Sequence, residues 1–162
     1  LMPSGYLRKQ LIDVINKLSD NFSSPKFEPH VTLVSGLYDS PNILLKKINK
    51  ISKKINSFEV LFDEISFLDK YFQSLFYKIK FNNCLALNRK LACDEFKINN
   101  KYMPHLSLVY GDFTLEQKIY MMSYVEIEPI SFCVDQIYLA RNDEIKMEWK
   151  VIKGYPLINE LN

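Results

Sequence analysis

The sequence lacks any long hydrophobic run and any excess of charge of one sign. No apolar stretch reaches the roughly 20 residues that a helix needs to cross a bilayer, so we expect no membrane partner. A net charge of +2 over 162 residues disfavours a broad surface that coats nucleic acid. The same balance permits a local positive pocket for a small anionic ligand.

Cysteine is scarce, and its three positions are odd in number and without metal-ligand spacing. We interpret Cys84, Cys93 and Cys133 as reduced thiols of an intracellular protein, and we expect a cytoplasmic location. No signal peptide is recognisable. The chain opens with Leu1 rather than an initiator methionine, so we expect a few residues to precede it in the natural protein.

The only two histidines lie in two copies of one ten-residue motif. The first copy, residues 27–36, reads FEPHVTLVSG, and the second, residues 102–111, reads YMPHLSLVYG. Proline, histidine, leucine, valine and glycine are identical between the copies. Three further positions keep an aromatic, a branched aliphatic and a hydroxyl side chain. We interpret this repeat as the candidate active site.

Apolar residues at three- and four-residue spacing predict four helices. We expect them over residues 4–22, 40–55, 82–93 and 114–125. Ser40 followed by Pro41 is a typical helix start, and Thr114 with Gln117 fits a capping box. Five lysines of the second helix indicate the solvated face of an amphipathic helix rather than a nucleic-acid site. They are Lys46, Lys47, Lys50, Lys53 and Lys54.

Alternating apolar residues predict strands between these helices. We expect the strands over residues 31–34, 58–67, 75–81, 106–109, 132–139 and 145–151. A bulge between Val134 and Ile137 keeps the fifth strand in phase, and a turn at Asn142-Asp143 precedes the sixth. The order helix, strand, helix and two strands is then roughly repeated. Residues 1–162 therefore predict one α+β domain with an internal structural duplication.

Each copy of the motif places a hydroxyl side chain two residues after its histidine. Residues i and i+2 of a strand project from the same face, about 6–7 Å apart at Cα, so His30 pairs with Thr32. His105 pairs with Ser107 in the same way. Strands lying side by side would direct both pairs into one groove that fits a phosphodiester. One imidazole can deprotonate the incoming oxygen while the other protonates the leaving oxygen, and the hydroxyls can hold the non-bridging oxygens.

Chance is a poor explanation of this pattern. Serine and threonine fill 15 of the 162 positions, so random placement would put a hydroxyl after both histidines in about one sequence in a hundred. One alternative is that both histidines serve only the fold, with satisfied hydrogen bonds. Another is a metal site built on the two histidines, but no third ligand is present at suitable spacing. Either histidine can be acid or base, because both copies offer the same groups.

The paired His-x-Thr and His-x-Ser motifs resemble the signature of the two-histidine (2H) phosphoesterase superfamily. Residues 27–33 and 104–112 look most like the cyclic phosphodiesterases of plants and yeast, and the resemblance covers nearly the whole chain. It implies two pseudo-symmetric lobes around a central groove, each with an antiparallel sheet and flanking helices. It also implies hydrolysis, without a metal or other cofactor, of ADP-ribose 1″,2″-cyclic phosphate or nucleoside 2′,3′-cyclic phosphates.

The resemblance also assigns roles to individual residues. It makes His30 and His105 the acid/base pair. Thr32 and Ser107 become the residues that hold the phosphate, and Tyr110 corresponds to a tyrosine of the family's second motif that can also touch it. It implies no metal ligand among them. The implied partners are a small cyclic phosphate and possible RNA ends, bound by a monomeric protein.

One departure from the family concerns its first strand, which carries an aromatic residue near the groove. We expect that strand upstream of Leu1, where the given sequence starts. Two alternatives to a cyclic phosphodiesterase stay open. One is a related enzyme that acts on RNA ends or 2′,5′-linked oligonucleotides, and the other is a phosphate-end binding module without catalysis.

Some further residues are weaker candidates for the site. Tyr71, Phe72 and Gln73 lie at a strand start where similar proteins carry pocket residues, and either aromatic ring could stack on a base. Arg141 could attract phosphate, although an ordinary loop arginine is an equally good interpretation. We interpret Trp149, in an alternating strand, as a core residue rather than a ligand platform.

Overall fold

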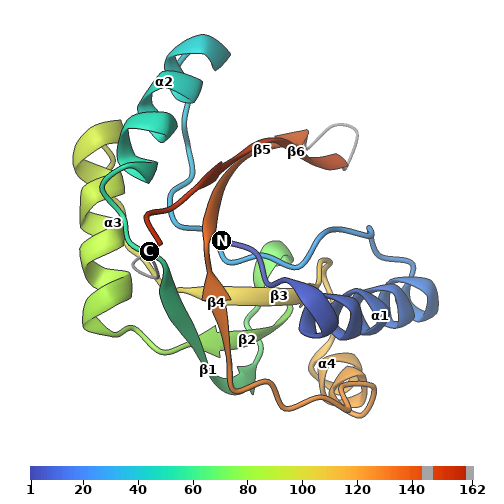
Figure 1. Cartoon of the computed structure of the whole chain (residues 1–162). Helices are drawn as coiled ribbons and strands as arrows, with labels where there is room; N and C mark the ends of the chain where they lie inside the picture. The colour runs from blue at the N-terminus through green and yellow to red at the C-terminus, as the bar shows by residue number, and fades with distance from the viewer. Residues whose placement is uncertain (144–147, 160–162) are drawn as a thin grey trace.

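The computed structural model describes residues 1–143 and 148–159, and its strands form two antiparallel sheets (Figure 1). The larger sheet has the order β3-β2-β1-β4, and the smaller is the hairpin β5-β6. The strands are β1 (Phe58–Ser66), β2 (Leu75–Ile79), β3 (His105–Val109), β4 (Ser131–Val134), β5 (Gln136–Asp143) and β6 (Glu148–Pro156). The helices are α1 (Gly5–Phe22), α2 (Pro41–Ser52), α3 (Asn83–Phe96) and α4 (Leu115–Met122), with a short 3-10 helix η1 (Tyr71–Gln73).

The helices lie on two sides of the sheets. α1 packs against β3 and α4 against β2, whereas α2 packs against the β5-β6 hairpin and α3. Figure 1 shows α1 and α4 together at one side of the molecule and α2 and α3 at the other. The expected α+β class, with antiparallel sheets flanked by helices, is confirmed. In the described part of the chain the two sheets are unequal, with four strands in one and two in the other.

The helix predictions are confirmed, apart from shifts at their ends. The predicted apolar stripe of α1 is buried at Leu11, Val14, Ile15 and Leu18. The capping box at the start of α4 forms as expected, although this helix ends at Met122 rather than near residue 125. In the described part of the chain, none of the helices combines the length and apolar character that a membrane span requires.

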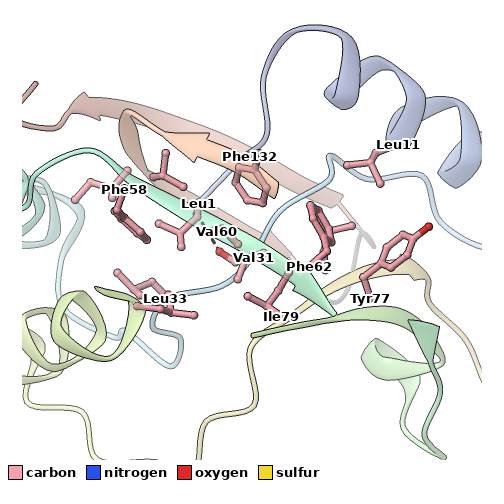
Figure 2. Close-up of a cluster of buried hydrophobic side chains, with 14 of the residues drawn as sticks. Leu1, Leu11, Val31, Leu33, Phe58, Val60, Phe62, Tyr77, Ile79 and Phe132 are labelled. Atoms are coloured by element: carbon pink, nitrogen blue, oxygen red, sulfur yellow. Dashed lines mark hydrogen bonds between the residues drawn. The ribbon is translucent and has the colours of Figure 1, made fainter. Parts of the chain in front are cut away.

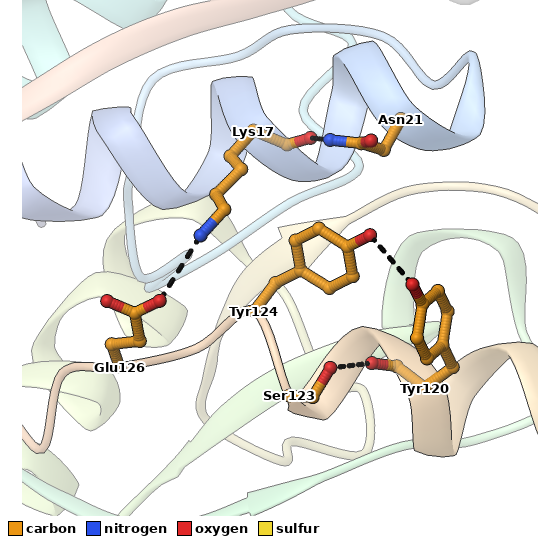
Figure 3. A network of polar contacts seen from close by, with 6 residues as sticks. All are labelled: Lys17, Asn21, Tyr120, Ser123, Tyr124 and Glu126. Carbon is orange, nitrogen blue, oxygen red and sulfur yellow. Dashed lines mark hydrogen bonds and ion pairs between the residues drawn. The ribbon is translucent and has the colours of Figure 1, made fainter.

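α1 is held against the segment around α4 by mixed polar and aromatic contacts (Figure 3). Lys17 Nζ pairs with Glu126 Oε1 at 3.2 Å and lies 5.3 Å from the Tyr124 ring centroid. The Tyr124 hydroxyl donates to the Tyr120 hydroxyl at 3.2 Å, and Phe22 meets the Tyr120 and Tyr124 rings edge to face. These contacts anchor the end of α1 from which the chain runs to the first histidine.

The hydrophobic core lies where β1 meets its neighbouring elements (Figure 2). Phe58, Val60 and Phe62 of β1 are buried, and Phe62 contacts the rings of Tyr77 on β2 and Phe132 on β4. Val31 and Leu33, from the first copy of the motif, are buried in the same cluster. Full burial of each such side chain contributes about 1.5–3 kcal/mol. The core thus fixes which residues of the first copy face inward.

The strand expected over residues 31–34 is reduced to a single bridge, between Val31 and Leu106. Two side chains take backbone carbonyls that a longer ladder would use. The Tyr102 hydroxyl donates to Thr32 O at 3.1 Å, and the Arg89 guanidinium donates to Leu33 O. The prediction of a regular strand was therefore wrong, because sequence periodicity does not reveal competing side-chain donors.

The strand expected over residues 132–139 is divided at Asp135 into β4 and β5. β4 pairs with β1 and β5 with β6, so the expected bulge is the point where the chain passes between sheets. The turn expected at Asn142-Asp143 is also wrong, since these residues pair with Trp149 and Glu148. Residues 145–147 of the last predicted strand lie outside the described residues, and the strand continues to Pro156.

Candidate active site

One cleft of about 930 Å³ is lined by residues of both copies of the motif. All five residues predicted for the site line it, namely His30, Thr32, His105, Ser107 and Tyr110. The cleft also receives residues from η1, β5 and β6. The tertiary structure therefore brings together two segments far apart in the sequence.

The register of the sheet explains how the second copy faces the cleft. Ser107 and His105 lie opposite Phe76 and Lys78 of β2, and the alternate residues Leu106 and Leu108 are fully buried. Because strand side chains alternate between faces, burial of the leucines directs the histidine and the serine to the opposite side. The bridge between Val31 and Leu106 places the first copy beside the second.

Both imidazoles are oriented by the same kind of hydrogen bond. His30 Nδ1 lies 2.7 Å from the carbonyl oxygen of Glu28, and His105 Nδ1 lies 2.9 Å from that of Met103. A carbonyl oxygen can only accept, so each Nδ1 carries the hydrogen. This leaves Nε2 of each ring as the nitrogen that can exchange a proton with a ligand.

Burial weakens the basicity of both rings. Burial lowers the pKa of His30 from 6.5 to about 4, because a charged imidazolium loses solvation there. Burial also holds the pKa of His105 below its ordinary value, and the nearby positive charge of Lys70 acts in the same direction. A bound anion would act in the opposite direction on both pKa values.

The two hydroxyls of the motifs differ in their surroundings. The Thr32 residue is exposed, whereas Ser107 is only 5% exposed. Ser107 Oγ donates to the carbonyl oxygen of Phe72 at 2.8 Å and is hydrogen-bonded to the Tyr110 side chain. Thr32 thus has a hydroxyl open to a ligand, while Ser107 is part of a small network at the cleft wall.

Aromatic rings surround the catalytic candidates. Tyr110 stacks on Phe27 with ring centroids 3.8 Å apart, and Phe72 meets Tyr110 edge to face at 5.2 Å. Trp149 of β6 stacks on His30 with centroids 4.3 Å apart and an interplanar angle of 12°. The interpretation of Trp149 as a core residue was wrong, since it is half-buried and lines the cleft. Its being the only tryptophan was the one signal available in the sequence.

Among the described residues, the charged side chains of the cleft wall are all basic. The wall includes four basic residues, and no described aspartate or glutamate lines it. The basic residues are Lys70, Arg89, Lys101 and Arg141. This favours an anionic ligand even though the whole chain is nearly neutral. Within residues 1–143 and 148–159, no three His, Cys, Asp or Glu side chains are grouped as ligands for a metal ion.

The weaker candidates from the sequence also reach the cleft. Tyr71, Phe72 and Gln73 of η1 line it, as does Arg141 of β5. Arg89 was missed altogether, and Tyr102, although part of the second copy, was given no role of its own. The two lie against each other with the guanidinium carbon 4.3 Å from the ring centroid. Arg89 is buried in α3, where an amphipathic pattern gave no reason to single it out.

Comparisons with known proteins agree with this geometry. Residues 1–154 match the model of the cyclic phosphodiesterase-like protein family. A 2′,3′-cyclic-nucleotide 3′-phosphodiesterase of Kluyveromyces lactis is 30% identical over 171 aligned residues, which cover 94% of this chain and 76% of that protein. A cyclic phosphodiesterase of Arabidopsis thaliana is 23% identical over 138 residues, which cover 80% of this chain and 76% of that protein.

The fold is shared with a solved structure. The crystal structure of E. coli LigT in its apo form matches with a TM-score of 0.62 at 15% identity, covering 96% of this chain and 92% of that chain. Together these matches confirm the resemblance to the two-histidine phosphoesterases and to their cyclic phosphodiesterase branch. The chain belongs to the cyclic phosphodiesterase-like protein family.

Proposed function

We propose that this chain hydrolyses a cyclic phosphodiester by metal-independent acid–base catalysis with His30 and His105. The observation that carries the proposal is the shared anchoring of the two rings in one cleft. Each ring gives its Nδ1 hydrogen to the carbonyl two residues earlier and keeps Nε2 for the ligand. Histidine pairs of this kind suit a reaction that needs one base and one acid near neutral pH.

The reaction adds one water across one ester bond of the ring. One imidazole takes a proton from the water as its oxygen forms a bond to phosphorus. The bond from phosphorus to one ring oxygen breaks, and the other ring, protonated beforehand, gives its proton to that oxygen. The product is an open phosphomonoester with a free hydroxyl. Proton exchange with solvent then restores the starting protonation of the two rings.

The remaining groups hold and stabilise the phosphate. Thr32 and Tyr110 can donate to its non-bridging oxygens, and Ser107 can do so when its hydroxyl turns from the carbonyl oxygen of Phe72 to the phosphate. The basic cleft wall counters the charge that develops in the transition state. Burial lowers the pKa of both histidines. A bound phosphate raises these pKa values again, so the substrate itself promotes protonation of the ring that acts as the acid.

The substrate we propose is a nucleoside 2′,3′-cyclic phosphate or ADP-ribose 1″,2″-cyclic phosphate. The name of the Kluyveromyces lactis relative supports the first. The aromatic side chains of Tyr71 and Phe72 at the cleft could contact a base or an adenosine group. The basic wall suits either substrate, because both carry at least one negative charge at neutral pH.

The test is turnover of the purified chain on both substrates, with and without a chelator. We expect equal rates in the two conditions. Loss of turnover with chelator would point to a metal site instead. His30→Ala and His105→Ala should each lower kcat by about 10²–10⁴-fold while circular dichroism stays unchanged. A mutant that keeps wild-type kcat would contradict the assigned role of that histidine.

Two further arms separate the alternatives. Faster turnover of RNA ends or of 2′,5′-linked oligonucleotides than of cyclic mononucleotides would identify the chain as the related enzyme. Tight binding of a cyclic nucleotide without any turnover, measured by calorimetry, would identify a binding module. The Tyr6→Leu variant is the control for both arms, because Tyr6 is 77% exposed on α1 and does not line the cleft.

A further inference from the structure

His30 and His105 are equivalent in the sequence, but among the described residues a parallel aromatic ring covers only His30. Trp149 lies against its face with centroids 4.3 Å apart and planes inclined by 12°. The aromatic neighbour of His105 is Phe76, which meets it at 67° with centroids 5.4 Å apart. The duplication therefore supplied the two histidines, while a residue outside both copies distinguishes them.

The imidazole of His30 is restrained from three directions. The carbonyl oxygen of Glu28 holds Nδ1 at 2.7 Å, Trp149 covers one face, and Phe27 approaches at 79° with centroids 6.4 Å apart. The hydrogen bond alone sets the position of one nitrogen, and the stack sets the plane of the ring. Both restraints together determine where Nε2 points.

Trp149 reaches this position from the β5-β6 hairpin. It pairs with Asn142 across the two strands, and it borders a small cavity shared with Phe27, Phe72 and Tyr110. The side chain thus joins the hairpin to the segment that carries the first histidine. A change in the hairpin would therefore reach His30 directly.

We propose that Trp149 is a positioning residue for His30, which fixes the plane of the imidazole and so the direction of Nε2 towards the substrate. The indole face also attracts a positively charged ring. It therefore opposes the cost of burial whenever His30 carries a proton during the reaction. The assignment of a catalytic role to His30 rests on the proposed function, but the restraint of its ring does not.

The kinetic test compares Trp149→Leu with Trp149→Phe. Leucine removes the aromatic face, and we expect kcat to fall about 10- to 100-fold with little change in KM, because misplacement of a reacting group by about 1 Å costs that much. Phenylalanine keeps an aromatic face and should restore most of the rate. If Trp149 were instead a platform for the substrate base, KM would rise and kcat would stay the same, and that result would overturn the proposal.

A control separates this effect from damage to the hairpin. Tyr155 is a buried aromatic residue of the same strand that does not line the cleft. Tyr155→Leu should lower stability but leave kcat of the folded protein unchanged. Equal losses of kcat in both leucine variants would show a structural effect only, and would contradict a specific role for Trp149.

Two spectroscopic measurements test the stack without any turnover. The chain has two histidines and one tryptophan. In the His105→Asn variant every histidine ring signal therefore belongs to His30. In the proton NMR spectrum, the indole ring current should shift the His30 ring signals upfield, and Trp149→Leu should remove the shift. A protonated imidazole in contact quenches indole emission, so the fluorescence of Trp149 should titrate with pH in the wild type and not in His30→Gln.

The two kinds of result distinguish the hypotheses. No turnover with any cyclic phosphate, but intact ring-current shift and fluorescence titration, would refute the proposed function and leave the restraint of His30 standing. Unshifted His30 signals, or the same fluorescence titration in His30→Gln, would refute the restraint itself. The titratable side chain whose charge acts on His30 in this titration is His105.

Discussion

Phe27 stacks on Tyr110 with ring centroids 3.8 Å apart and planes inclined by 14°. The aromatic residue that opens the first copy thus lies on a residue of the second copy. The reverse also holds, because Tyr102, which opens the second copy, donates its hydroxyl to Thr32 O at 3.1 Å. The two copies therefore form one structural unit, in which each supports the other.

This reciprocal packing leads to a prediction for Tyr110. Tyr110→Phe should keep the stack on Phe27 and lose only the hydroxyl that is hydrogen-bonded to Ser107. We expect kcat for the cyclic phosphate to fall by about tenfold, since one donor near the phosphate is lost, with stability nearly unchanged. Burial raises the pKa of Tyr110, so the hydroxyl stays protonated throughout the assay range.

The matched variant for this pair is Phe27→Leu. It removes the stack and keeps the hydroxyl, so urea denaturation should show a loss of about 1–2 kcal/mol. A Phe27→Leu protein as stable as the wild type would show that the stack contributes nothing. Tyr110→Phe with wild-type kcat would remove this hydroxyl from the proposed mechanism.

The stability of the fold should depend on the protonation of His30. Burial lowers the pKa of His30 from 6.5 to about 4, so between these values the unfolded chain binds a proton that the folded chain does not. The resulting stability is fully present above about pH 6.5 and is lost as the pH falls to about 4. The loss from this residue should be on the order of 3 kcal/mol. The pKa of His105 is lowered too, so its contribution has the same sign.

Urea denaturation at a series of pH values measures this effect. The free energy of unfolding of the wild type should decrease more steeply on acidification than that of His30→Gln. Parallel curves for the two proteins would show that the pKa of His30 is not lowered in the folded state.

Gly111, the last residue of the second copy, should not tolerate a side chain. Its φ is +146°, and an added Cβ would lie 2.6 Å from the ring of Phe113. Gly111→Ala should therefore destabilise the protein by more than about 1 kcal/mol and lower its melting temperature.

The equivalent glycine of the first copy is a matched control. Gly36 has φ of +74° but no neighbour within 4 Å of an added Cβ, so Gly36→Ala should cost only the backbone strain of about 1 kcal/mol. Equal melting temperatures for the two variants would show that the contact with Phe113 is relieved without cost.

Arg89 should be essential for the arrangement of the two copies. Its guanidinium donates to Leu33 O and to Asn100 Oδ1, and it lies on the ring of Tyr102. A lysine cannot make both hydrogen bonds from one fork. Arg89→Lys should therefore lower the free energy of unfolding by about 1–3 kcal/mol and lower kcat/KM as well.

The neighbouring position is a suitable control for Arg89. Lys90 is exposed and pairs only with Asp94 on the same helix in the described structure. Lys90→Met should change stability by less than about 0.5 kcal/mol. If Arg89→Lys were as harmless as Lys90→Met in thermal denaturation and in turnover, the link between the copies would not depend on the guanidinium.

Much of this protein could be predicted from its sequence. The helices follow from apolar spacing and start signals, such as the capping box at Thr114, because these patterns depend only on neighbours along the chain. The repeated motif identified His30, Thr32, His105 and Ser107, because two histidines with matched hydroxyls are a rare combination, and the family resemblance added Tyr110. All five line the cleft. The prediction of their catalytic roles awaits experiment.

The differences between the two copies could not be predicted in this way. Arg89 and Tyr102 occupy the carbonyls of Leu33 and Thr32, so the first copy forms one bridge instead of a strand. Trp149 stacks on His30, whereas His105 meets the ring of Phe76 edge to face. The contacts of Arg89, Tyr102 and Trp149 join residues separated by 50 or more positions, and no periodic pattern encodes such a pairing.

The sequence by itself thus determined which chemical groups the protein has and which faces of its helices and second-copy strand are buried. Only the tertiary structure decided that both histidines share one cleft, and that His30 and His105 have different surroundings there. The physical reason is that periodicity reports local burial, whereas the environment of an imidazole depends on every element packed around it.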